Sequence, residues 1–276
     1  GGTIVRMPVG VSNDGSMLFV LAGSRLGTGD VLVEQGRLAL EDDAAIDPAA
    51  RLWMCLDAPV TGEAVFYTPY RCYAYFRSAA PVIGSLEGLG QVVLGNAVTP
   101  AANTTLTVGG DNTDSAFFGR IAQNAGRVGS LVKAGTGTFT LGGANTYTGA
   151  TTVDAGQLRL VGSLAGGVTV AANGTFSGRG VIAGALTVNG VVKVELRGDG
   201  DHDQLVISGT ATFTEGSALV IDAGSFRLPY GEPVVFLTAA GGVTDRPASP
   251  QGYRILATTT TLALARTPLA SVLIVR

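Results

Sequence analysis

The chain has 276 residues, of which 46% are hydrophobic, only 14% are charged, and 41 are glycine. Its 18 Lys and Arg against 21 Asp and Glu give a net charge of −3, and without a basic cluster we expect no nucleic-acid partner. No apolar run reaches the roughly 20 residues that a membrane-spanning helix needs, and the N-terminus does not resemble a signal peptide. Because the chain begins with Gly1-Gly2, we expect it to be a piece of a longer protein.

Short strand-like runs, separated by Gly-containing turns, occupy the first part of the chain. The clearest is residues 31–40, VLVEQGRLAL. Gly36 in this run fits a corner with close backbone approach, and Leu38 and Leu40 fall on one face of a strand because side chains alternate. The same arrangement of Gly and Leu recurs in residues 153–160, VDAGQLRL. Two matched copies predict one continuous architecture.

Residues 41–82 interrupt this pattern with a segment rich in aromatic residues. Turn signals between Cys55 and Cys72 predict a hairpin, which could bring the two sulfur atoms close enough for a disulfide, while two buried thiols are the alternative. A bridge across this loop would contribute about 3 kcal/mol in the chain-entropy account. The aromatic side chains either cover the coil over the inserted hairpin or form an exposed adhesive patch, since Tyr and Trp are frequent interface anchors. The candidate contact residues are Trp53, Phe66, Tyr67, Tyr70, Tyr73 and Tyr75.

Strand-like runs resume at Ile83, separated by Gly or Asn-Gly turns, and helical periodicity is nowhere sustained. Turns every 8–12 residues or so are also typical of a β-sandwich or barrel. A recurrence of roughly 20 residues favours a coil of strands instead. It is clearest where TFTL (138–141) and QLRL (157–160) alternate in the same way. A unit this short cannot bury its own apolar face and must stack on a neighbour.

A longer motif covers this central stretch. Residues 135–160, GTGTFTLGGANTYTGATTVDAGQLRL, resemble the passenger-associated repeat of Gram-negative autotransporters, which use type V secretion, and match it at nearly every Gly, Thr and Asn. Residues 83–125 resemble the rung that often precedes this repeat, and residues 203–245 resemble the C-terminal passenger segment. The matched positions of the repeat include Asn145, Tyr147, Thr148 and Gly149.

The resemblance implies an all-β fold, a right-handed parallel β-helix (a solenoid) with a C-terminal autochaperone-like cap. We expect N-terminal β-helix rungs with the inserted Cys-bounded aromatic hairpin in residues 1–82, a β-helix with the repeat in residues 83–202, and the cap in residues 203–276. In that family the last portion helps the passenger to fold at the outer membrane. Within the cap we expect Phe236 and Leu237 to belong to its core.

The resemblance further implies a non-catalytic stalk and autochaperone portion of a secreted or surface-displayed virulence factor, which passes through the periplasm to the outer-membrane surface or the extracellular space. Its partner would be the outer-membrane translocator barrel of the same polypeptide. An alternative function is that of an adhesin for a host surface or serum protein, acting through residues 53–76 or the integrin-recognition tripeptide Arg197-Gly198-Asp199. A weaker alternative is a carrier whose enzymatic domain, for instance a protease, lies upstream of Gly1.

Residues that could support chemistry are few. His202 is the only histidine, and its charged, Gly-rich surroundings predict a solvent-exposed side chain rather than a member of a catalytic triad. Asp199, Asp201 and Asp203 alternate as in a calcium loop, but the glycine and the bidentate glutamate of such a loop are replaced. We therefore expect no catalytic residue, no metal and no small-molecule cofactor.

Overall fold

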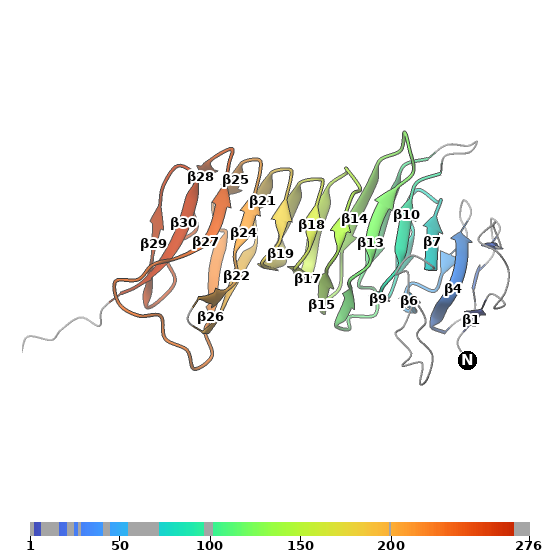
Figure 1. The fold of residues 1–276 in the computed structure, drawn as a ribbon, viewed down its shortest axis with the longest axis horizontal. Helices are drawn as coiled ribbons and strands as arrows, with labels where there is room; N and C mark the ends of the chain where they lie inside the picture. Colours follow the sequence, from blue (N-terminus) through green and yellow to red (C-terminus); the bar gives the residue numbers. More distant parts are fainter. Residues whose placement is uncertain are drawn as a thin grey trace, which may run out of the picture.

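The computed structural model describes residues 3–6, 17–20, 25–26, 29–40, 45–54, 72–96, 102–198 and 200–267. In these residues every regular element is a β-strand, and the strands stack along one axis into an elongated coil (Figure 1). Pairing along the coil is parallel, which confirms the expected all-β parallel β-helix. The described part of the chain has no helix with the length and apolar character needed to cross a membrane.

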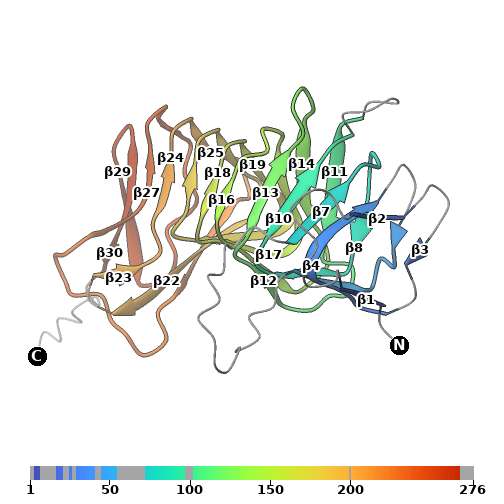
Figure 2. The ribbon, with the colours of Figure 1, turned by 45° about the vertical axis from the view of Figure 1, so that its right-hand side comes forward.

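Three stacks of strands form the sides of the solenoid, and each turn of the chain, or coil, adds one strand to each stack (Figure 2). The first stack contains β1 (Thr3–Arg6), the first half of β4 (Val31–Leu40), β6 (Arg51–Met54), β9 (Ser85–Gly88), β12 (Ser115–Phe117), β15 (Thr138–Leu141), the second halves of β17 (Thr151–Leu160) and β19 (Val168–Gly178), β22 (Val191–Gly198) and β26 (Ala218–Asp222).

The second stack contains β2 (Met17–Val20), the second half of β4, β7 (Cys72–Phe76), β10 (Gln91–Leu94), β13 (Arg120–Gln123), β16 (Ala144–Asn145), β18 (Ser163–Leu164), β20 (Val181–Ile182), β24 (Leu205–Ile207) and β27 (Val234–Ala239). The third contains β3 (Arg25–Leu26), β5 (Ala45–Ile46), β8 (Val82–Ile83), β11 (Thr104–Val108), β14 (Gly129–Lys133), the first halves of β17 and β19, β21 (Leu186–Val188), β25 (Ala211–Phe213) and β28 (Val243–Thr244). The neighbours β13 and β16, and β5 and β8, lie side by side without a regular strand pairing.

Apolar side chains of successive coils lie directly over one another inside the solenoid. In the first stack the strand register places Phe139 on Leu158, Leu158 on Phe176, Phe176 on Val192 and Val192 on Leu219. All five side chains are buried. The predicted alternation of apolar and polar positions therefore produces an inner ladder, with one apolar contact for every coil that is added.

Parallel stacking ends at the C-terminal end of the described chain. There β27 pairs in parallel with β24 on one side and antiparallel with β30 (Thr261–Arg266) on the other, and β30 pairs antiparallel with β29 (Tyr253–Ala257). Phe236 and Leu237 of β27 are buried, and so are Leu262 and Leu264 of the hairpin strand β30. The hairpin thus covers the last strand of the second stack, while the first and third stacks end at β26 and β28.

Candidate functional site

Asn145 of the repeat joins three successive coils. Its side chain is almost fully buried at the point where β13 and β16 lack a regular strand pairing. The side-chain Oδ1 accepts a hydrogen bond from the Ile121 N–H of the preceding coil at 2.9 Å, and Nδ2 donates to the carbonyls of Gly142 in its own coil at 2.9 Å and of Ser163 in the next coil at 3.1 Å. The side-chain amide therefore supplies hydrogen bonds between coils at a point where strand pairing does not provide them.

Tyr147 fills the corner between the second and third stacks. Its side chain is fully buried, and its hydroxyl lies 2.6 Å from the Oγ1 of Thr151. Thr151 occupies the inner ladder of the third stack between Leu131 and Val168, so it needs a hydrogen-bond partner that its apolar neighbours cannot supply. Burial raises the pKa of the Tyr147 hydroxyl, and the two hydroxyls satisfy each other.

Thr148 and Gly149 fix the same corner to the preceding coil. The side-chain Oε1 of Gln123 accepts hydrogen bonds from the backbone N–H groups of Thr148 at 2.8 Å and of Gly129 at 3.0 Å. A Cβ atom at Gly149 would lie 2.2 Å from the Ser130 Oγ and 2.3 Å from the Gly129 carbonyl oxygen, which excludes any larger residue in this backbone. Asn145, Thr148 and Gly149 thus act on the contact between coils, whereas Tyr147 fills the corner of its own coil.

Lys133 is a buried cation in an otherwise apolar ladder. The register places it between Val108 and Val153 in the third stack, and only 1% of its surface is exposed. Its ammonium donates hydrogen bonds to the carbonyl oxygens of Ala134, of Gly135 at 3.1 Å and of Ala155 at 3.4 Å, so it ties two successive corners together. Desolvation by burial lowers the pKa of Lys133. Sequence reasoning missed this residue, although the alternation of residues 129–133 places it on the same face as Leu131.

The loop between β22 and β24 is held by a charged cluster. Arg197 donates to the carboxylates of Glu195 at 2.6 Å and Asp203 at 2.7 Å. Asp203 is almost fully buried, and its Oδ2 accepts hydrogen bonds from the Gly178 N–H at 3.2 Å and the Glu195 N–H at 3.3 Å. The side chain of the first residue of the candidate integrin tripeptide is therefore engaged within the fold; Gly198 is half-buried, and Asp199 lies outside the described residues.

His202 differs from its expected exposure. It belongs to β23 (Asp201–His202), which folds back antiparallel onto β22, and the side chain is half-buried with Nε2 3.0 Å from the carbonyl oxygen of Val235. The expectation of an exposed side chain was wrong because residues 223–236 return to this loop from a later coil. Among the described residues, no group of three His, Cys, Asp or Glu side chains is arranged to hold a metal ion.

The described part of the aromatic segment lies on two stacks. Trp53 is half-buried on β6, and Tyr73 and Tyr75 are half-buried on β7, with ring centroids 6.1 Å apart and an interplanar angle of 16°. Arg37 lies over the Tyr73 ring at 5.4 Å, and Arg77 lies over the Tyr75 ring at 5.8 Å.

Cys72 is fully buried. Cys55, Phe66, Tyr67 and Tyr70 lie outside the described residues, so the disulfide and a single aromatic patch stay predictions.

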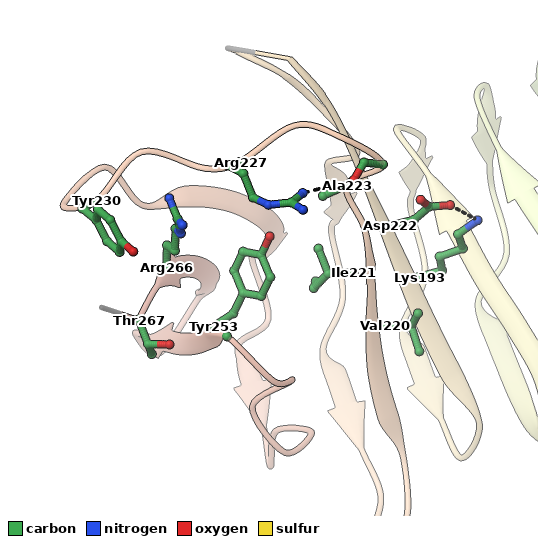
Figure 3. Close-up of a pocket in the computed structure, with 12 residues that line it drawn as sticks. Lys193, Val220, Ile221, Asp222, Ala223, Arg227, Tyr230, Tyr253, Arg266 and Thr267 are labelled. Carbon is green, nitrogen blue, oxygen red and sulfur yellow. Dashed lines mark hydrogen bonds and ion pairs between the residues drawn. The ribbon is translucent and has the colours of Figure 1, made fainter. Parts of the chain in front are cut away.

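A groove of about 570 Å³ opens beside β26 at the C-terminal end of the solenoid (Figure 3). We call it the C-terminal groove. Figure 3 shows Lys193 and Asp222 on one side of it, joined by an ion pair of 2.8 Å, and Tyr230 and Arg266 on the other side. The residues after β26 that line the groove include Arg227, Tyr230, Tyr253 and Arg266.

The guanidinium of Arg266 lies 4.2 Å from the centroid of the Tyr230 ring. The hydrogen bond from Lys193 to Asp222 raises the pKa of this lysine and lowers the pKa of this aspartate. Sequence reasoning did not find the C-terminal groove, because its residues come from three separate parts of the chain.

A comparison with family models finds one match, in which residues 131–160 correspond to the passenger-associated-transport-repeat. This match contains Lys133 and Asn145, whose side chains join successive coils, and the buried Tyr147–Thr151 pair. It supports an autotransporter passenger domain, and such a domain is secreted to the cell surface or the extracellular space. No curated protein matches the chain.

Asn145→Leu should lower the free energy of unfolding by about 1–3 kcal/mol, because the variant leaves the buried Ile121 N–H without an acceptor. Asn173→Leu makes the same replacement at an exposed position of β19 and is the matched control. Urea unfolding followed by circular dichroism measures both, and hydrogen exchange at the Ile121 amide should become faster in Asn145→Leu alone. Equal losses of stability in the two variants would contradict a bridging role for Asn145.

Lys133→Met should change how stability depends on pH. Burial lowers the pKa of Lys133 in the folded chain below its value in the unfolded chain, which is about 10.4. Between these two pKa values the unfolded chain holds more protons than the folded chain, so the wild type gains stability as the pH rises through this range. The variant lacks this gain, whereas all other titrating groups are shared. The difference in free energy of unfolding between wild type and variant, measured at several pH values from neutral to alkaline, should therefore increase in favour of the wild type. A difference that stays constant with pH would rule out a desolvated ammonium.

Proposed function

We propose that this chain is the β-helical stalk and autochaperone portion of a bacterial autotransporter passenger, which supports folding and export and presents surfaces outside the cell. The observation that carries the proposal is the coincidence of the passenger-associated repeat with the side chains that bridge neighbouring coils, above all Asn145. A segment whose distinctive residues serve coil-to-coil contact suits a scaffold. The partner that follows from this proposal is the translocator of the same polypeptide.

Folding from the C-terminal end would support export. Each completed coil presents unpaired backbone groups, which the next coil can pair with, so a stack grows by addition at an open edge. The β29–β30 hairpin is formed from residues close in sequence, and such local antiparallel pairs form faster than distant parallel ones. We infer that residues 203–276 provide this starting structure. Stacking outside the membrane would then bias movement outward without an external source of ATP.

Adhesion is a second candidate function. It is favoured by the stacked pair of Tyr73 and Tyr75 on β7, with the Arg37 guanidinium over the first ring and the Arg77 guanidinium over the second. Aromatic and arginine side chains are the residue types most often found at the centres of protein interfaces. The test is binding of the purified chain to host cells. A loss of binding in a double variant, Tyr73→Ser with Tyr75→Ser, would favour adhesion, and unchanged binding would exclude adhesion through this surface.

Phe236→Ala in the full-length protein should lower surface display more than it lowers the total amount of protein. Phe236 is buried where the hairpin meets the last coils, and truncation of a buried Phe costs about 3–5 kcal/mol. The fraction displayed is measured by antibody labelling of intact cells against an immunoblot of total protein. Leu237→Ala tests the adjacent position in the same way.

The matched control is Phe176→Ala, which removes an equally buried ring from β19, in the middle of the solenoid. If the C-terminal portion initiates folding, Phe176→Ala should reduce display less than Phe236→Ala does. The same loss of display in both variants, or a loss of display no greater than the loss of total protein, would count against the proposed role of the cap.

A further inference from the structure

We propose that the C-terminal groove binds a sugar unit that carries a carboxylate or phosphate group. The proposal does not depend on the role of the chain in export. It rests on the charge of the groove, on the way in which its arginines are held, and on the mixed apolar and polar surface between them.

The charge of the C-terminal groove differs from that of the shaft. Outside the groove, several cationic side chains have carboxylate partners: Arg159 pairs with Glu195, Arg179 pairs with Asp201, and Arg197 pairs with Glu195 and Asp203. In the groove, neither Arg227 nor Arg266 has a carboxylate within ion-pair distance among the described residues. Since the Lys193–Asp222 pair is neutral as a whole, the groove carries two uncompensated positive charges in a chain whose net charge is −3. Such a site favours an anionic ligand.

Both arginines are already held in place. The Arg266 guanidinium stacks on the Tyr230 ring, and the Arg227 Nη1 donates to the carbonyl oxygens of Gly224 at 3.1 Å and Phe226 at 2.9 Å. A guanidinium has five N–H donors in a fixed planar fork, so each arginine retains donors for a carboxylate or phosphate. Because these side chains are ordered before a ligand arrives, binding loses less conformational entropy.

The remainder of the C-terminal groove suits a sugar ring rather than a bare anion. Its volume of about 570 Å³ lies in the range of small-molecule sites and exceeds what a single phosphate would fill. Figure 3 shows the Tyr253 ring between Arg266 and Ile221, and the Tyr253 hydroxyl has no hydrogen-bond partner among the described residues. A sugar offers an apolar ring face to the tyrosine and hydroxyls to its phenol and to the exposed Asp222 carboxylate. The acid group would then lie against Arg227 and Arg266.

Calorimetric titration of the purified chain with cellobiouronic acid, cellobiose and inorganic phosphate tests the proposal. The acidic disaccharide should bind at least about tenfold more tightly than the neutral disaccharide or phosphate, since hydrogen bonds between charged groups are stronger than hydrogen bonds between neutral groups. Arg266→Gln should remove this preference. Arg254→Gln is the matched control, because this substitution removes the same charge. Arg254 is an exposed residue of the same hairpin and does not line the groove.

Several results would overturn the proposal: equal affinities for the acidic and neutral disaccharides, phosphate binding as tight as that of the sugar acid, or an equal loss in Arg254→Gln. If circular dichroism shows that Arg266→Gln does not fold, Arg266→Lys replaces it in the test. This variant retains the cation without the planar fork and should bind the sugar acid more weakly than the wild type does. Two further probes distinguish the source of the sugar: vesicles that contain lipopolysaccharide represent a membrane glycolipid, and soluble alginate represents a free acidic polysaccharide. If the wild type binds one of these probes and the Arg266 variant does not, the result supports the proposal. If the wild type binds neither probe, the proposal is overturned.

Discussion

The structure depends on hydrogen bonding between coils, because no coil can satisfy its own backbone. A strand in this solenoid pairs with the strand before it and the strand after it in the same stack, so every N–H and C=O group relies on the correct register of a neighbouring turn. The inner ladder from Phe139 to Leu219 depends on the same register, since each apolar side chain is covered by the corresponding side chain one coil away. Backbone pairing and apolar burial therefore form together or not at all.

Apolar ladders alone specify this register weakly. Leu, Phe and Val occupy equivalent positions in many coils, and a displacement by a whole coil would bury similar side chains. Buried polar groups oppose such a displacement, because Asn145 bonds Ile121 and Ser163 in the coils on either side and Lys133 bonds the Ala155 carbonyl one coil away. A displaced coil would break the bonds that the buried Asn145 amide makes to both neighbouring coils, at a cost of about 1–3 kcal/mol for each group left unpaired.

Local features of the fold could be predicted from the sequence, and features that depend on register could not. The alternation at residues 138–141 and 157–160 was sufficient to place Phe139 and Leu158 inside, and the repeat indicated that Asn145 and Tyr147 were important. The partners of Asn145 were not predictable, because Ile121 and Ser163 are brought to it by connections of different length on either side. His202 shows the same limit, since its contact with Val235 depends on how residues 223–236 return to the coil.

The C-terminal groove illustrates why the ends of a solenoid differ from its shaft. Along the solenoid, side chains of neighbouring coils lie within reach of one another, so Lys193 pairs with Asp222 on the adjacent strand and Arg159 reaches Glu195 across one intervening coil. In the first stack no strand follows β26 in the described chain, and the hairpin pairs with β27 in antiparallel instead of parallel orientation. Its arginines are held by a tyrosine ring and by backbone carbonyls instead of carboxylates. Two arginines without carboxylate partners among the described residues thus meet where the parallel repetition stops, and a binding site can arise there without any change to the coils that support it.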